Sequence, residues 1–257
     1  MDLHLRGKRV LITGASKGIG AAAAESFAEE GCHLRLAARS GEQLKALADR
    51  LRSAHQIDAS THVVDLRKPA DLARLATDAA DIDILVNNAG DIPGGSIDKI
   101  DEATWRHAWE LKVFGYINLT RAIYAQMKAR GDGVIVNDIG AAGEKFDANY
   151  ICGSAGNAAL MAFTRALGGK SLADNIRVVG INPGPVGTDR HVTLLKTRAR
   201  TSSATRAATR NSRRAFRSAA PRTPARSATC VGTDRHVTLL KTRAKNQFGD
   251  ENRYKEF

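Results

Sequence analysis

The chain has 257 residues, of which 43% are hydrophobic and 26% charged, as in an ordinary soluble α/β domain. No apolar run approaches the roughly 18 residues that span a bilayer, and the first residues lack a signal-peptide pattern. Three cysteines are too few for a disulfide scaffold, so we expect a cytoplasmic protein. Collagen, coiled-coil and membrane proteins are thereby excluded.

The formal net charge of +12 is confined to the end of the chain. Residues 1–189 hold 22 Lys and Arg against 23 Asp and Glu, a net charge of −1. Residues 190–257 hold 17 basic and 4 acidic residues, a net charge of +13. The body of the protein is therefore not expected to present a uniformly basic surface.

Apolar runs that end in glycine or polar residues predict six strands, and Ala-rich or amphipathic segments predict helices between them. The predicted strands are 8–13, 32–38, 61–65, 82–87, 133–137 and 176–182. The predicted helices are 18–30, 41–54, 69–80, 102–130 and 152–172. This alternation predicts an α/β fold with a doubly wound, Rossmann-like parallel sheet in three αβα layers.

A glycine-rich turn at 13–20 joins the first strand to the first helix. Glycines let the backbone approach a ligand, and the helix N-terminus offers N–H groups to a pyrophosphate. At this place in a doubly wound sheet the turn predicts a dinucleotide site, although a tight packing turn is the alternative. Arg39 ends the second strand, and with Lys17 it favours NADP(H) over NAD(H), unless it is only a solvated surface residue.

Four motifs follow one another in the order of a known family. They are TGASKGIG at 13–20, DL at 65–66, NNAG at 87–90 and NPGPVGT at 182–188. Residues 5–199 thus resemble the short-chain dehydrogenase/reductase family, whose members reduce carbonyls or oxidise alcohols by hydride transfer. The resemblance implies NADP(H), with NAD(H) as the alternative, a small carbonyl or alcohol substrate, and a homodimer or homotetramer formed through the helices 102–130 and 152–172.

The resemblance also implies the cofactor contacts. Those to the phosphates and ribose come from Gly14, Ser16, Gly18, Ile19 and Gly20. Those to the adenine come from Asp65 and Leu66, and those along the cofactor from Asn88, Ala89 and Gly90. Those to the nicotinamide carboxamide come from Pro183, Gly184, Val186 and Thr188.

The catalytic positions depart from the family pattern. A Tyr, a Lys four residues later, a Ser 13 residues before the Tyr and an Asn in the long helix are expected. These positions align with Gly153, Asn157, Gly140 and Lys112, respectively. All four usual side chains are therefore replaced.

Tyr150 lies three residues before Gly153 and is the nearest phenol. If both positions are helical they face alike, so we expect Tyr150 to act as the catalytic acid or base. Lys112 is the candidate for the missing cation, and Asn157 for a hydrogen bond to the nicotinamide ribose. The alternatives are a Tyr150 that is only a cap or loop residue and a non-catalytic protein that binds NADP(H) or a partner.

The end of the chain departs from an ordinary sequence. Residues 186–199 recur letter for letter at 231–244, and the segment 200–230 between them has eight Arg, no Lys and no acid. One GC-rich coding of 244–252, read after loss of a single nucleotide, spells out 199–206. We therefore interpret 1–199 as the NADP-binding domain, 200–230 as an Arg-rich, out-of-frame and disordered segment, and 231–257 as a duplicated lid segment with a truncated C-terminus.

Two further expectations concern this region. Nothing after Thr188 predicts the last strand that the resemblance implies, and either 194–199 or its duplicate could begin the lid helix, but not both. We therefore expect the C-terminal helix and last strand to be missing or scrambled. The alternative, a nucleic-acid-binding tail, is disfavoured because Phe216 is the only aromatic residue between the two copies. We expect no nucleic-acid, membrane or metal partner.

Overall fold

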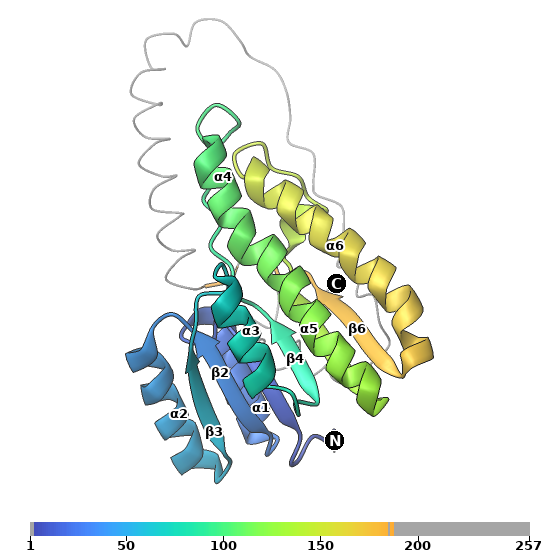
Figure 1. The fold of residues 1–257 in the computed structure, drawn as a ribbon. Coiled ribbons are helices and arrows are strands. Elements are labelled where there is room, and N and C mark those ends of the chain that lie inside the picture. The colour runs from blue at the N-terminus through green and yellow to red at the C-terminus, as the bar shows by residue number, and fades with distance from the viewer. Residues whose placement is uncertain (1–2, 185, 188–257) are drawn as a thin grey trace, which may run out of the picture.

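The computed structural model describes residues 3–184 and 186–187. Figure 1 shows a sheet with helices packed against it. Thr188, the segments 200–230 and 231–257, and the predicted loss of a last helix and strand lie outside the described residues.

In the part of the chain that the structure describes, six parallel strands form one sheet in the order β3-β2-β1-β4-β5-β6. The strands are β1 (Arg9–Thr13), β2 (His33–Ala38), β3 (Ala59–Val63), β4 (Ile84–Asn87), β5 (Gly133–Asp138) and β6 (Ile176–Ile181). The chain winds outward from β1 to β3 and then returns to continue at β4, on the other side of β1. This order confirms the doubly wound sheet and places the switch point between β1 and β4, where such sheets bind ligands.

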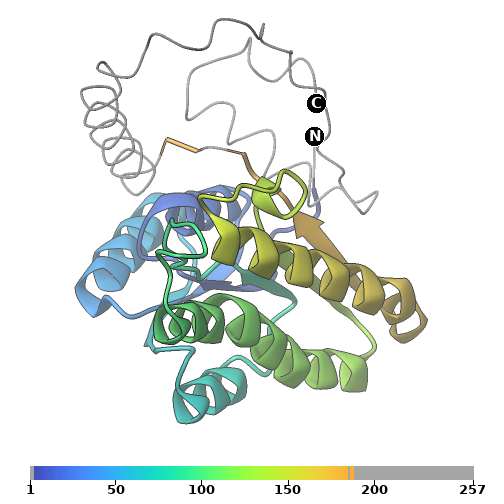
Figure 2. The ribbon, with the colours of Figure 1, turned by 90° about the horizontal axis from the view of Figure 1, so that it is seen from above.

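The helices cover both faces of the sheet, as the view from above in Figure 2 shows. They are α1 (Gly18–Glu29), α2 (Gly41–His55), α3 (Pro69–Asp78), α4 (Glu102–Trp109), α5 (Gly115–Arg130) and α6 (Ile151–Ser171). Side chains alternate along each strand, so Val10 and Ile12 pack into the core beneath α1 and α2. Leu11 between them packs into the opposite core, beneath α3 and α5.

Two predicted elements differ from those observed. The third strand is Ala59–Val63 rather than 61–65, because Asp65 turns away and its N–H donates to Asp71 Oδ2 at the start of α3, 2.9 Å away. The long helix predicted at 102–130 is interrupted by a π-helical turn, η1 (Glu110–Phe114). That turn carries Lys112, and π-turns in helices occur frequently at functional sites.

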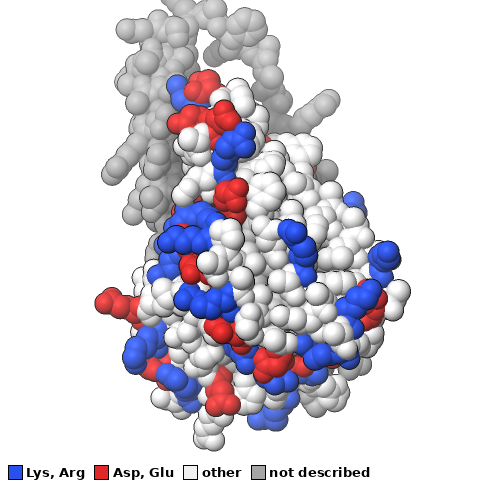
Figure 3. Space-filling model, in the orientation of Figure 1, with Lys and Arg blue, Asp and Glu red and all other residues white. Residues whose placement is uncertain are grey.

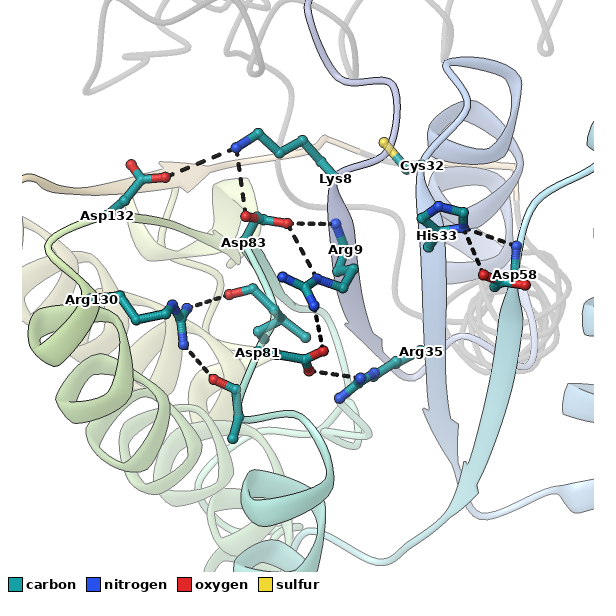
Figure 4. Close-up of polar contacts among 12 residues, drawn as sticks. Lys8, Arg9, Cys32, His33, Arg35, Asp58, Asp81, Asp83, Arg130 and Asp132 are labelled. Atoms are coloured by element: carbon teal, nitrogen blue, oxygen red, sulfur yellow. Dashed lines mark hydrogen bonds and ion pairs between the residues drawn. The ribbon is translucent and has the colours of Figure 1, made fainter.

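The amino ends of the strands are held by ion pairs (Figure 4). Lys8 Nζ lies 3.5 Å from Asp83 Oδ1, and Arg9 Nη1 lies 2.7 Å from Asp81 Oδ2. Arg35 Nη2 from β2 lies 2.7 Å from Asp81 Oδ1. These pairs tie β1 and β2 to the start of β4, so this edge has a structural role.

Among the described residues, no helix combines the length and the apolar character that a membrane span requires.

Candidate cofactor and active site

The loop between β1 and α1 is built for close backbone packing. Gly14 has a positive φ of 67°, and a Cβ atom added there would lie 2.8 Å from Ala89 Cα. A Cβ atom on Gly20 would lie 2.4 Å from the Gly14 carbonyl oxygen. Helix α1 has no side-chain cap from Lys17 and no acid in its first turn. Its first amides and positive dipole end therefore suit an anion such as a pyrophosphate.

Asn88 and Thr13 join this loop to the end of β4. Asn88 Nδ2 donates to the carbonyl oxygens of Thr13, at 2.9 Å, and Gly14, at 3.2 Å. Thr13 Oγ1 accepts from the backbone N–H groups of Asn88 and Ala89, at 3.0 and 3.1 Å. The two segments that the sequence assigns to the cofactor thus meet at the switch point of the sheet.

Charged residues surround the ends of β2 and β3. Arg39 Nη2 lies 3.9 Å from Asp91 Oδ2, and both side chains are exposed. The Arg67 guanidinium donates to both oxygens of Asp65, with Nε 2.8 Å from Oδ1 and Nη2 2.6 Å from Oδ2. These bonds, with a smaller contribution from Arg39, lower the pKa of Asp65. Leu66 beside it is buried.

Tyr150 reaches position 153 by a route that the sequence did not predict. It is the N-cap of α6 with φ −139° and ψ 38°, so it is not helical as the expected i, i+3 pairing requires. Yet a Cβ atom added to Gly153 would lie 2.0 Å from Cε1 and 2.1 Å from Cζ of the Tyr150 ring. The ring therefore occupies the space that a side chain from position 153 would need.

The backbone on both sides of Tyr150 is fixed by one partner. The Gly95 N–H donates to the Asn149 carbonyl oxygen at 2.7 Å, and the Ile151 N–H donates to the Gly95 carbonyl oxygen at 3.3 Å. The loop after β4 thus holds the start of α6 in place. This contact joins segments that are far apart in the sequence, so no local pattern predicts it.

Lys112 extends from η1 to the carboxyl end of β5. Its Nζ donates to the carbonyl oxygen of Ile139 at 2.8 Å and of Asp138 at 3.4 Å. Its Cδ lies 2.8 Å from where a Cβ atom of Gly90 would be, so Gly90 leaves room for it. Nζ is also 5.7 Å from the centre of the Tyr116 ring. The sequence-predicted cation is therefore placed between the ends of β4 and β5.

Asp138, the last residue of β5, was missed by sequence reasoning. It is 8% exposed, and within the described part of the chain its Oδ1 has no hydrogen-bond partner. Burial raises the pKa of Asp138 to about 6, while Lys112 acts in the opposite direction. Burial, Asp138 and Tyr150 together raise the pKa of Tyr116, whose hydroxyl donates to the Asp138 carbonyl oxygen at 2.9 Å. The available sequence signal was an acid at the end of an otherwise apolar strand.

Asn157 faces Gly140 across the site. Asn157 Nδ2 donates to the Gly140 carbonyl oxygen at 3.3 Å, while its Oδ1 is buried with no protein partner among the described residues. Gly140 has a φ of 112°, a conformation that disfavours the Ser expected there. The Asn182 Oδ1 atom just after β6 is likewise buried and without a partner in the described chain. These two acceptors suit a polar ligand that donates hydrogen bonds.

The remaining predicted cofactor residues lie at the same edge of the sheet. They are Ser16, Gly18, Ile19, Pro183, Gly184 and Val186. Ser16 lies in the β1–α1 connection, Gly18 and Ile19 begin α1, and the other three follow β6. Thr188 lies beyond the described residues.

A doubly wound sheet with a glycine-rich loop and an Asn at its switch point defines a class of nucleotide-binding α/β proteins. The family model described as short chain dehydrogenase matches residues 8–199. The chain belongs to the short-chain dehydrogenase family, a family of oxidoreductases, and the predicted family and fold class are confirmed.

Three relatives illustrate this similarity. NADPH-dependent aldehyde reductase 1, chloroplastic, from Arabidopsis thaliana is 31% identical over 195 residues, which cover 72% of this chain and 67% of the relative. The 7α-hydroxysteroid dehydrogenase of Escherichia coli is 32% identical over 194 residues, covering 73% and 74%. The structure of L-sorbose reductase from Gluconobacter frateurii, complexed with NADPH and L-sorbose, is 34% identical, covers 74% of each chain and has a TM-score of 0.71.

Proposed function

We propose that this protein transfers a hydride between NADP(H) and a carbonyl or alcohol substrate, with Tyr150 moving the hydroxyl proton. The observation that carries this proposal is the Tyr150 ring in the space of a side chain from position 153. Position 153 is where the family resemblance requires a catalytic Tyr. A phenol supplied from three residues earlier replaces the missing one.

The residues present fit a nicotinamide cofactor. The close-packed glycines and the uncapped start of α1 suit the pyrophosphate, and Arg39 suits a 2′-phosphate. The Oδ1 atoms of Asn157 and Asn182, which have no partner within residues 3–184 and 186–187, suit the hydroxyl and amide donors of a nicotinamide riboside. When bound, the nicotinamide supplies the hydride in reduction and accepts it in oxidation. NADPH appears in the names of two of the relatives, and another solved neighbour is complexed with NADH, so NAD(H) is the alternative.

In this proposal Tyr150 donates its proton to the substrate oxygen during reduction and accepts it during oxidation. Lys112 provides the positive charge that favours the phenolate form of Tyr150. In the family pattern this charge comes from a Lys at the position that Asn157 occupies here. Lys112 Nζ is 5.7 Å from the centre of the Tyr116 ring, and Tyr150 contributes, after burial and Asp138, to raising the pKa of Tyr116. Asn157 accepts a hydrogen bond from the nicotinamide ribose.

The test compares Tyr150→Phe with Tyr124→Phe. Tyr124 lies on α5, and its hydroxyl bonds Asp174 at 2.6 Å, remote from the carboxyl edge of the sheet. We expect Tyr150→Phe to lower turnover of a carbonyl panel by about 100-fold or more with NADPH binding retained. Tyr124→Phe should leave turnover within about twofold. A fully active Tyr150→Phe variant contradicts the proposal.

The second candidate is a non-catalytic NADP(H)-binding protein of the same fold. Gly140, Gly153 and Asn157 favour it, because they replace the usual catalytic Ser, Tyr and Lys. NADPH titration with a carbonyl panel separates the two candidates. Tight binding without turnover of any member of the panel supports the second one.

We further propose a cytoplasmic homodimer or homotetramer that uses small-molecule substrates and binds neither nucleic acid nor membranes. The upper right of Figure 3, where α6 lies in Figure 1, is largely uncharged. A groove of about 570 Å³ beside α4 is lined by Trp105, Trp109 and Phe114, among others. The described cysteines, Cys32 and Cys152, are free and buried, which agrees with a reducing compartment. Light scattering after size exclusion tests the oligomer, and a monomer contradicts it.

A further inference from the structure

We infer that Asp91 limits the preference for NADPH over NADH, because its carboxylate engages Arg39, the residue that a 2′-phosphate requires. This inference rests on the proposed NADP(H) site. Asp91 follows the NNAG segment directly, and no motif in the sequence assigns it a role. It is a specificity-determining residue rather than a catalytic one.

The geometry places the two charges together across the end of the sheet. Arg39 follows β2 and Asp91 follows β4, and β1 lies between these strands. Arg39 Nη2 is 3.9 Å from Asp91 Oδ2, while 52% of the Arg39 side chain and 65% of the Asp91 side chain are exposed. A pair this open to solvent is weak, so a ligand anion can displace the carboxylate.

The surrounding charges make Arg39 the base that can exchange its partner. Arg39, Asp65, Arg67 and Asp91 form a cluster of two acids and two bases, with a formal net charge of zero. The cluster is electrostatically coupled, since Arg39 adds to the effect of Arg67 in lowering the pKa of Asp65, and Asp91 adds to the effect of Asp65 in raising the pKa of Arg67. The bonds from Arg67 to Asp65 include two of 2.8 and 2.6 Å, whereas the contact from Arg39 to Asp91 is 3.9 Å long, so Arg39 is the guanidinium that can take another anion.

The consequence differs between the two nucleotides. A 2′-phosphate must displace the Asp91 carboxylate before it can bind the Arg39 guanidinium. NADH carries no such group and leaves the ion pair intact. Asp91 therefore weakens NADPH binding selectively and narrows the preference that Arg39 creates.

The test is a fluorescence titration of the full chain with NADPH and with NADH at low ionic strength. Removing a unit charge about 4 Å from the guanidinium in a solvent-exposed site is expected to change affinity about fivefold. We expect Asp91→Asn to bind NADPH roughly three to ten times more tightly and NADH about equally. High salt should shrink the NADPH gain, because exposed charges are screened.

Two further variants serve as controls. In an Arg39→Ala background Asp91→Asn should lose most of its selective effect, since the pair no longer exists. Asp98→Asn removes an exposed acid from the same loop, where it bonds Ser96 and Lys99, and should not alter selectivity.

The outcomes distinguish the inference from the proposed function. Equal changes in NADPH and NADH affinity, the same gain from Asp98→Asn, or a full gain without Arg39 each overturn the role of Asp91. All three leave the proposed oxidoreductase standing, because nucleotide binding persists. Absence of binding of either nucleotide by every protein, including the unaltered chain, overturns both.

Discussion

Replacing the buried acid at the end of β5, Asp138→Asn, should stabilise the protein at neutral pH. Burial raises the pKa of Asp138 from the ordinary 3.8 to about 6. Below about pH 4 the carboxyl is protonated in both the folded and unfolded chains, so it does not affect stability. Between about pH 4 and 6 the unfolded chain loses this proton first, which favours unfolding increasingly as the pH rises.

The magnitude follows from that difference in pKa. The pKa of Asp138 is raised by about 2.2, from 3.8 to about 6. Because a difference of one in pKa corresponds to 1.36 kcal/mol, the ionised carboxylate costs roughly 3 kcal/mol of folding free energy above pH 6. At about pH 5 the cost is about half as large. Asn has nearly the same shape and no charge to bury, so the variant should recover most of this free energy.

The assay is urea unfolding at about pH 5 and pH 7.5. Asp138→Asn should raise the free energy of unfolding at both values, with the larger gain at pH 7.5. Asp132→Asn, at an exposed acid just before β5, should change stability by no more than about 0.5 kcal/mol. A destabilised Asp138→Asn variant, or a gain that does not grow with pH, would refute the reasoning.

The other predictions concern the site. Gly153→Ala should lower turnover at least tenfold, because the new Cβ would lie 2.0 Å from the Tyr150 ring. Gly169→Ala meets no atom of the described chain within 4 Å and should leave turnover intact. Equal turnover of the two variants in a carbonyl assay would argue against a role for the position of the Tyr150 ring. Lys112→Met should lower turnover by about 10²-fold and retain NADPH binding, because it removes the cation but keeps most of the length of the side chain. Stopped-flow kinetics measures the rate and fluorescence titration the binding. An unchanged rate would exclude a catalytic role for Lys112. Gly14→Val should abolish NADPH binding, since its side chain would meet Ala89 Cα at 2.8 Å, and normal binding in a fluorescence titration would contradict the cofactor assignment.

The sheet and its cofactor end could be predicted from local patterns. Short apolar runs fix the strands, and the glycine spacing at 13–20 fixes the turn, because each depends on neighbouring residues alone. The third strand lies two residues earlier than the sequence predicts. Its end depends on the hydrogen bond from the Asp65 N–H to Asp71, which a strand pattern does not reveal. The π-turn around Lys112 was hidden in a continuous helical pattern.

The arrangement of the catalytic residues was harder to predict, because it also depends on contacts between distant segments. The sequence indicates Tyr150 as the nearest phenol, but its approach to Gly153 depends on its non-helical conformation at the N-cap of α6 and on the backbone contact with Gly95. The burial of Asp138 and the pairing of Asp91 with Arg39 both depend on segments that are distant in the sequence. Such neighbours are set by topology, and a single sequence carries no local signal for them.

Single-turnover oxidation of enzyme-bound NADPH by a carbonyl substrate tests the central claim most directly. The unaltered protein and Tyr150→Phe are loaded with equal amounts of NADPH, mixed with the substrate in a stopped-flow instrument, and followed by loss of nicotinamide absorbance. We expect rapid loss of absorbance in the unaltered protein and almost none in the variant at the same NADPH occupancy. Equal rates in the two proteins would show that the Tyr150 hydroxyl does not supply the proton.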